Sequence, residues 1–234
     1  MRKFLLFLFI GVPFAAISQI SNSRAQNINP FYFSNDLPVL VDKYPRFADG
    51  SPYFSEDWLN GDITITGGKL YENIKVRLDL VDNTLQYISP KGAELVAITP
   101  IMNVLLKDSA QKKEYRFVHS SSIKSSKNIT TGWYILLVSG PATLYKHISK
   151  TIIQPKNISS GATEPTVNTA EEYFIYTDSL LAQVKKTKEI PELLKSKSSE
   201  LNDYLSKKKL SGKSESNYVE MIRYYNSLGE SEKQ

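Results

Sequence analysis

Alternation of apolar and polar residues is the clearest pattern in this chain, and it is strongest between residues 51 and 98. Apolar residues occupy every second position from Ile74 to Leu80, and charged residues fill the three positions between them. This period of two is typical of a half-buried strand with one face toward a core. We therefore predict that residues 51–98 form a series of short antiparallel strands.

Gly67-Gly68 is predicted to close the first hairpin of this series. A two-residue loop requires positive φ at both central positions, which glycine adopts without a steric penalty. This loop would place Ile65 opposite Leu70 and Thr64 opposite Tyr71. The break in alternation just after Tyr71 predicts a bulge or a short turn.

Asp82-Asn83 is predicted to close the next hairpin, again as a two-residue loop. Leu80 would then pair with Leu85, and Leu78 with Tyr87. All four side chains would lie on the apolar face of the strand, so the turn and the burial pattern agree on this register.

Further strands are predicted where β-branched, aromatic and aliphatic residues run between turn residues. These segments are residues 94–98, 101–106, 115–118, 133–138, 173–176 and 180–184. Residues 133–138 are apolar throughout, which favours a central strand covered on both faces. Residues 143–153 are ambiguous, because apolar residues recur every fourth position while β-branched residues favour a strand. We expect a strand there, with a helix as the alternative.

Three helices are predicted after Lys186, where the apolar period lengthens. Thr187 is expected to cap the first, Ser198 or Ser199 to precede the second, and Ser214 with Glu215 to start the third. Gly229 is expected to end the third helix. The side chains predicted to share its buried face are those of Tyr218, Met221, Ile222 and Tyr225.

These elements predict an α+β fold. It consists of a mainly antiparallel β-sheet, either a plain meander or one curled into a partly open barrel, followed by a small C-terminal three-helix unit. The expected segments are a signal peptide (1–18), an irregular arm (19–50), the β domain (51–155), a linker (156–170), a β-hairpin (171–186), the helices (187–229) and a tail (230–234).

The N-terminus has the pattern of a secretory signal peptide. Arg2 and Lys3 precede an apolar run too short to span a bilayer, and the small-residue triplet Ala16-Ile17-Ser18 precedes Gln19. Ser23-Arg24-Ala25 is a second candidate cleavage site. We therefore expect export to the periplasm or the extracellular medium, and no integral membrane segment after cleavage.

Composition and charge exclude several classes of function. The chain has no cysteine, which excludes disulfides, thiolate metal sites and a cysteine nucleophile. Its formal charge is +5, of which Arg2 and Lys3 contribute two, and so small a surplus does not predict nucleic-acid binding. An envelope protein or a glycan is a more plausible partner class.

Several short motifs resemble those of a family of uncharacterised exported proteins of Bacteroidota. They are Ser51-Pro52-Tyr53-Phe54 with Trp58 and Gly61, Gly67-Gly68-Lys69 with Tyr71-Glu72-Asn73, and Tyr224-Tyr225-Asn226-Ser227-Leu228 near the C-terminus. The resemblance implies export and a β-then-helical layout. The family has no assigned activity, so the resemblance implies no catalytic residue.

Residues with catalytic potential are few and are better explained by structure. His119 opens a serine-rich loop (residues 120–131), but no nucleophile elbow surrounds it, and His147 is expected on the surface. Glu56-Asp57 could serve acid–base chemistry beside Trp58, which is more simply a packed core residue. We assign no catalytic, cofactor-binding or metal-binding residue.

Our first hypothesis is a non-enzymatic exported protein with a role in binding or envelope structure. The candidate binding surface comprises Phe31, Tyr32, Phe33, Trp58 and His119. One alternative is a small apolar ligand inside a curled sheet, which filling of the curl by Ile74, Val76, Leu78 and Leu85 would rule out. The other is a hydrolase of envelope polymers that uses Glu56, Asp57 or His119.

Overall fold

The computed structural model describes residues 37–38, 43–125, 129–154 and 164–230. The expected signal peptide and Phe31, Tyr32 and Phe33 lie outside these residues. The strands are β1 (Leu37–Pro38), β2 (Leu59–Ile65), β3 (Leu70–Asp79), β4 (Thr84–Ile88), β5 (Glu94–Val96), β6 (Ile101–Asp108), β7 (Lys113–His119), β8 (Trp133–Val138), β9 (Thr143–Ile153), β10 (Thr166–Thr177) and β11 (Leu180–Val184).

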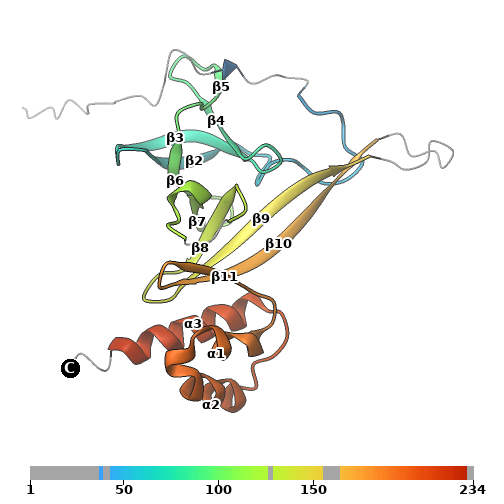
Figure 1. Ribbon diagram of the computed structural model, residues 1–234. Coiled ribbons are helices and arrows are strands. Elements are labelled where there is room, and N and C mark those ends of the chain that lie inside the picture. The colour runs from blue at the N-terminus through green and yellow to red at the C-terminus, as the bar shows by residue number, and fades with distance from the viewer. Residues whose placement is uncertain (1–36, 39–42, 126–128, 155–163, 231–234) are drawn as a thin grey trace, which may run out of the picture.

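All eleven strands belong to one antiparallel sheet that does not close, and the C-terminal helices follow it (Figure 1). The predicted α+β class is confirmed. The strand order is β1-β5-β4-β3-β2-β6-β7-β8-β9-β10-β11. The chain therefore adds β3, β4 and β5 on one side of β2 and then returns to place β6 on its other side. Residues 143–153 form β9, as favoured.

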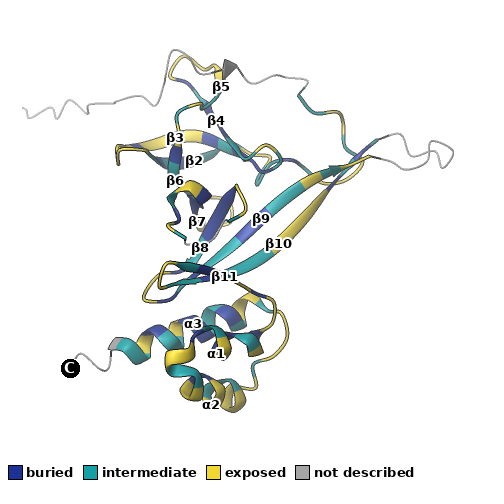
Figure 2. Cartoon of the chain, viewed as in Figure 1, coloured by how far each residue is buried: buried dark blue, intermediate teal, exposed yellow. Residues whose placement is uncertain are grey.

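The sheet buries two apolar clusters on one face, which we call the covered face. Leu144 and Ile148 lie four residues apart on β9 and so point to the same side of the sheet. Ile148 belongs to the larger cluster, with Val76, Leu78 and Phe117, whereas Leu144 belongs to the cluster beneath the helices. Figure 2 shows buried positions in both regions.

The helical unit packs on the covered face at the β8–β11 end of the sheet. It contains α1 (Ile190–Leu193), α2 (Ser198–Lys208) and α3 (Glu215–Glu230). Tyr218, Met221 and Ile222 of α3 are buried there, as predicted from their spacing, and Tyr225 is half-buried against the same cluster. The Asn226 side chain accepts a hydrogen bond from the Ala142 amide (2.9 Å) and donates to the Ala142 carbonyl (2.9 Å), which fixes α3 to the β8–β9 turn.

Residues 43–58 form a strap that joins β3 to the far end of the β9–β10 hairpin. Asp79, at the end of β3, is fully buried and accepts hydrogen bonds from Lys43 Nζ (2.6 Å) and the Tyr44 hydroxyl (2.8 Å). Farther along, the Val167 amide donates to the Asp49 carbonyl (2.9 Å) and Lys150 Nζ donates to the Ser51 carbonyl (2.9 Å). The strap thus holds the curl of the sheet.

The Gly67-Gly68 loop is one residue longer than predicted. Both glycines have positive φ (95° and 81°), but Thr64 pairs with Leu70, and Ile65 pairs with Lys69 through its amide. Our register for this hairpin was therefore wrong. The observed register places the Leu70 side chain on the side of the sheet away from the core, where it is 53 % exposed.

The Asp82-Asn83 loop is longer by two residues, with Leu78 opposite Leu85. The Asp79 carboxylate accepts hydrogen bonds from the amides of Val81 and Asp82, both at 3.1 Å, and these bonds fix the conformation of the first residues of the turn. A shift of two residues preserves the face, because side chains alternate with period two. The pairing was wrong, but the predicted core side was right.

Three further boundaries differ from expectation. Residues 166–170, assigned to the linker, already belong to β10, where they pair with β9. Thr187 does not cap α1; it lies in a 3₁₀ turn and its hydroxyl donates to the Gly212 carbonyl (3.1 Å). Helix α3 continues through Gly229 to Glu230 rather than ending there.

Candidate functional site

The other side of the sheet, which we call the outer face, carries two neighbouring rows of side chains. Cross-strand pairing defines the first row as Leu70, Thr64, Asn103, Val118, Tyr134 and His147. The second row runs through Asp62, Leu105 and Arg116, and then through Leu136, Tyr145 and Phe174. Both rows change from aliphatic and polar residues on β2–β7 to largely aromatic residues on β8–β10.

The described residues of the loop that follows β7, 120–125 and 129–131, cover the aromatic half of the outer face, and we call them the roof. Ile123 of the roof is buried in a cluster with Tyr134 and Leu181, and Ile129 packs against the same cluster. Tyrosine hydroxyls hold the roof through its backbone: Tyr176 donates to the Lys124 carbonyl (2.8 Å) and Tyr134 to the Thr130 carbonyl (3.0 Å). One polypeptide segment is therefore already seated on this face.

The other half of the outer face is an open groove of about 410 Å³. Four aliphatic and four polar or charged residues line it: Leu70, Leu105, Val118, Leu136, Asp62, Thr64, Asn103 and Arg116. Val118 and Leu136 also belong to the cluster under the roof, so the groove continues the roofed surface without a break. We call this groove the open groove.

Two charged residues of the open groove differ in their surroundings. Asp62 is 14 % exposed and is neutralised by Lys107, whose Nζ lies 2.6 Å from Asp62 Oδ2. Its other oxygen accepts from the Asn73 amide (3.0 Å), at the predicted bulge in β3. The Arg116 side chain is exposed and makes no hydrogen bond or ion pair with any residue that the structure describes. Its guanidinium is thus free to bind an anionic group.

His147 lies at the roofed end of the first row and is 2 % exposed, so its predicted surface position was wrong. Its ring stacks on Tyr134 at a centroid distance of 4.5 Å. Burial lowers the pKa of His147, and Glu172, whose Oε2 lies 3.8 Å from Nδ1, opposes that change. Nδ1 has no hydrogen-bond partner among the described residues.

His119 caps a short 3₁₀ turn at the start of the roof. Its Nδ1 lies 2.8 Å from the Ser121 hydroxyl oxygen and accepts from the Ser121 amide (3.3 Å), and its ring packs edge-on against Trp133. Burial lowers the pKa of His119, which favours the neutral ring. The contact with Ser121 is a local turn interaction rather than part of a wider relay.

Trp58 is half-buried at the strap and is covered by a cation. The Arg77 guanidinium lies between the rings of Tyr53 (3.9 Å) and Trp58 (4.4 Å), and its Nη2 donates to Gln86 Oε1 (2.8 Å). This stack attaches the strap to β3 and β4. Trp58 and His119 therefore belong to separate local structures, and neither lines the open groove.

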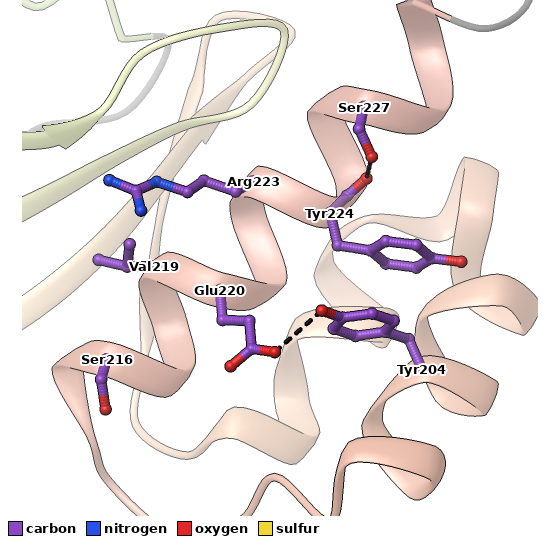
Figure 3. Close-up of a pocket in the computed structure, with 7 residues that line it drawn as sticks. All are labelled: Tyr204, Ser216, Val219, Glu220, Arg223, Tyr224 and Ser227. Carbon is purple, nitrogen blue, oxygen red and sulfur yellow. Dashed lines mark hydrogen bonds between the residues drawn. The ribbon is translucent and has the colours of Figure 1, made fainter.

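A second depression, of about 610 Å³, lies along the helical unit (Figure 3). Tyr204 of α2 and Tyr224 of α3 stack at 3.8 Å, and the Tyr204 hydroxyl donates to Glu220 Oε1 (2.9 Å). Figure 3 shows Arg223 and Val219 projecting away from this pair. The aromatic rings and the carboxylate bind each other, which leaves fewer groups for a ligand than the open groove has.

Two features that are absent from the described residues bear on the class of site. Within them, no cluster of three or more His, Cys, Asp or Glu residues could hold a metal ion. No helix in the described part of the chain is both long and apolar enough to cross a membrane. Comparison with protein families, curated proteins and solved structures finds no match for this chain.

The residues of the open groove were not singled out from the sequence. Leu105 and Arg116 lie in segments predicted as strands, but their common face depends on pairing between β2 and β6, which are distant in sequence. The one usable signal was the loop of residues 120–131, whose Ile123 and Ile129 are isolated apolar residues in a polar segment. Isolated aliphatic residues in a polar loop suggest that it docks on an apolar surface.

Proposed function

We propose that this protein is an exported, non-enzymatic binding protein that holds an extended segment of a partner polypeptide in the open groove. The segment would carry an aliphatic side chain and an acidic side chain. The observation that carries the proposal is the roof: a polypeptide with aliphatic residues at Ile123 and Ile129 already occupies the adjoining half of the same face.

The contacts of the roof supply the expected mode of binding. Its aliphatic side chains enter the apolar cluster, while tyrosine hydroxyls hold its carbonyl groups. The open groove repeats this chemistry, since Leu105, Val118 and Leu136 form an apolar floor and Thr64 and Asn103 provide hydrogen-bonding groups. Burying one aliphatic side chain there contributes roughly 1.5–3 kcal/mol of transfer free energy before ordering costs are subtracted.

The charges of the open groove favour an acidic residue in the bound segment. Asp62 is neutralised by Lys107, whereas the Arg116 guanidinium is exposed and unpaired within the described residues. A guanidinium presents a planar pair of donors that matches a carboxylate. A carboxylate of the bound segment would therefore pair with Arg116 at the side of the apolar floor.

The alternatives from the sequence find less support. Three of the four residues in our criterion against an apolar ligand, Val76, Leu78 and Leu85, fill the curl of the sheet and are each at most 2 % exposed. The fourth, Ile74, is half-buried and packs against the same cluster. The hydrolase alternative required Glu56, Asp57 or His119. Glu56 and Asp57 are exposed, and His119 is engaged in a turn. We propose neither function.

Export is part of the proposal and has its own test. Expressed in a bacterium with a general secretory pathway, the full-length chain should appear outside the cytoplasm with Gln19 or Gln26 as its first residue. Mass spectrometry of the intact protein distinguishes the two cleavage sites. Full-length protein that stays in the cytoplasm would contradict export while leaving the binding test unaffected.

The binding proposal is tested with a displayed library of random linear dodecapeptides selected on the wild-type protein. Selected peptides should combine aliphatic and acidic residues. Calorimetric titration should show that Arg116→Glu weakens their binding by about tenfold or more, because a charge-assisted contact becomes repulsive. Leu70→Ser, at the exposed rim, should weaken binding less.

Arg223→Glu is the matched control, because Arg223 is also exposed and unpaired within the described residues but lies on α3. It should leave peptide affinity unchanged. Peptides that bind Arg116→Glu as tightly as the wild type, or a selection that yields no binding peptide, would refute the proposal.

A further inference from the structure

Strand β11 is the last strand of the sheet in the described part of the chain, and its outer edge is the basis of a separate inference. Asp178 and Ser179, with φ of 49° and 61°, form the two-residue loop between β10 and β11. In such a hairpin the residues next to the loop, Thr177 and Leu180, form a hydrogen-bonded pair.

Alternation along the hairpin then determines which backbone groups face outward. Ala182 and Val184 pair with Ile175 and Tyr173, and their backbone groups point toward β10. The N–H and C=O groups of Leu181 and Gln183 therefore point away from the sheet. No described strand pairs with them there.

This edge lacks the features that usually prevent strands from pairing. Its sequence, Leu-Leu-Ala-Gln-Val, contains no charged residue and no proline. The opposite edge, β1, is only two residues long and contains Pro38. Natural sheets protect exposed edges with lysine, proline, bulges or short strands, so an unprotected edge indicates a pairing surface.

We propose that β11 pairs antiparallel with β11 of a second copy of this chain, about a two-fold axis at Ala182. In that register Leu181 faces the partner's Gln183, and Gln183 faces the partner's Leu181. The outward backbone groups of these two residues then form a ladder of hydrogen bonds with their counterparts. The two Ala182 methyl groups meet at the axis, where a small side chain leaves room for close approach.

The charges that flank the strand favour this self-pairing. Asp178 lies in the turn before β11, and Lys186 follows the end of the strand. Antiparallel pairing therefore brings the Lys186 end of one copy beside the Asp178 end of the other, and the two-fold axis repeats this arrangement. Both residues are exposed, and neither has an ion pair with a described residue. Opposite charges across paired strands stabilise the pair, whereas like charges would oppose it. The interface is independent of the open groove and of the function proposed for it.

Sedimentation equilibrium of the full mature chain tests the interface. The wild type should associate reversibly to a dimer as its concentration rises. Gln183→Pro removes one outward N–H from each copy and leaves the backbone hydrogen bonds between β11 and β10 in place. The side-chain bond from Gln183 Nε2 to Glu172 Oε1 (2.6 Å) is lost in both Gln183→Pro and Gln183→Thr, so the comparison isolates the N–H. Only the proline variant changes the pairing edge. It should weaken dimerisation about tenfold, while Gln183→Thr, which keeps the N–H, should not.

Cross-linking locates the axis. Because the chain has no cysteine, Ala182→Cys introduces a single thiol at the predicted axis, and Ala170→Cys places one on an exposed part of β10 as the control. Under mild oxidation Ala182→Cys should form disulfide dimers much faster than Ala170→Cys. A protein that stays monomeric, a dimer insensitive to Gln183→Pro, or equal cross-linking of the two variants would overturn the proposal.

Discussion

Asp79 and His147 are both buried, and they differ in how far their polar atoms are satisfied. The Asp79 carboxylate accepts from Lys43, Tyr44 and two backbone amides, so its burial is compensated on every side. His147 stacks among aromatic rings, and its Nδ1 has no hydrogen-bond partner in the described residues. Buried polar groups stabilise a fold only when they are paired.

Asp79→Ala should destabilise the protein by about 3 kcal/mol, because it leaves a buried ammonium, a hydroxyl and two amides without their acceptor. The free energy of unfolding in urea measures this loss. Asp82→Ala is the matched control, since Asp82 contacts the same lysine (2.8 Å) with a side chain that is 49 % exposed. It should cost about 0.5 kcal/mol. Equal losses would contradict the role of Asp79 as the anchor of the strap.

His147 should make the fold sensitive to mild acid. Burial lowers its pKa below 6.5, so the unfolded chain binds the proton more readily than the folded chain. Its contribution to stability is therefore present above about pH 6.5 and is lost as the pH falls toward the lowered pKa of the folded state. Glu172 reduces the effect without reversing it.

The melting temperature should drop less between pH 7.5 and pH 5.5 in His147→Phe than in the wild type, because phenylalanine keeps the ring stack and cannot be protonated. Burial also lowers the pKa of His119. The His119→Gln variant therefore serves as the comparison, because it measures the part of the pH dependence that comes from His119. If His147→Phe keeps the full pH dependence of the wild type, His147 is not the responsible group.

At the scale of elements, strands and core faces were predictable from the sequence, whereas loop lengths and helix ends were not. Alternation from Ile74 to Leu80 identified β3 and its buried side, because period two is a local property. The loop after β3 depends on the Asp79 carboxylate. This carboxylate accepts hydrogen bonds from two amides of the loop and binds a lysine of the strap, which is distant in sequence. Such tertiary contacts are not readable from turn composition.

Gly67→Val should destabilise the first hairpin by about 1 kcal/mol or more, because valine disfavours positive φ. A Cβ at Gly67 would have no atom within 4 Å, so this cost comes from the backbone conformation and not from a clash. Gly67→Asn should cost less, since asparagine tolerates that conformation. Thermal unfolding measures both variants, and equal melting temperatures for valine and glycine would contradict the turn geometry.

At the scale of the whole molecule, the two faces of the sheet have different roles. The covered face packs the strap and the helical unit, while the outer face is divided between the roof and the open groove. The open groove could not be predicted, because it requires β6 to return beside β2 after β5 has formed. The sequence residues proposed for binding, Trp58 and His119, instead hold the strap and the roof in place.

The central claim is that the open groove binds an acidic, aliphatic polypeptide segment. Its most direct test is an NMR titration of isotope-labelled protein with a dodecapeptide selected on the wild type. The largest shifts should map to Leu105, Arg116, Val118 and Leu136, and Arg116→Glu should suppress them. Shifts centred on the Tyr204–Tyr224 pair, on Trp58, or on no contiguous surface would contradict it.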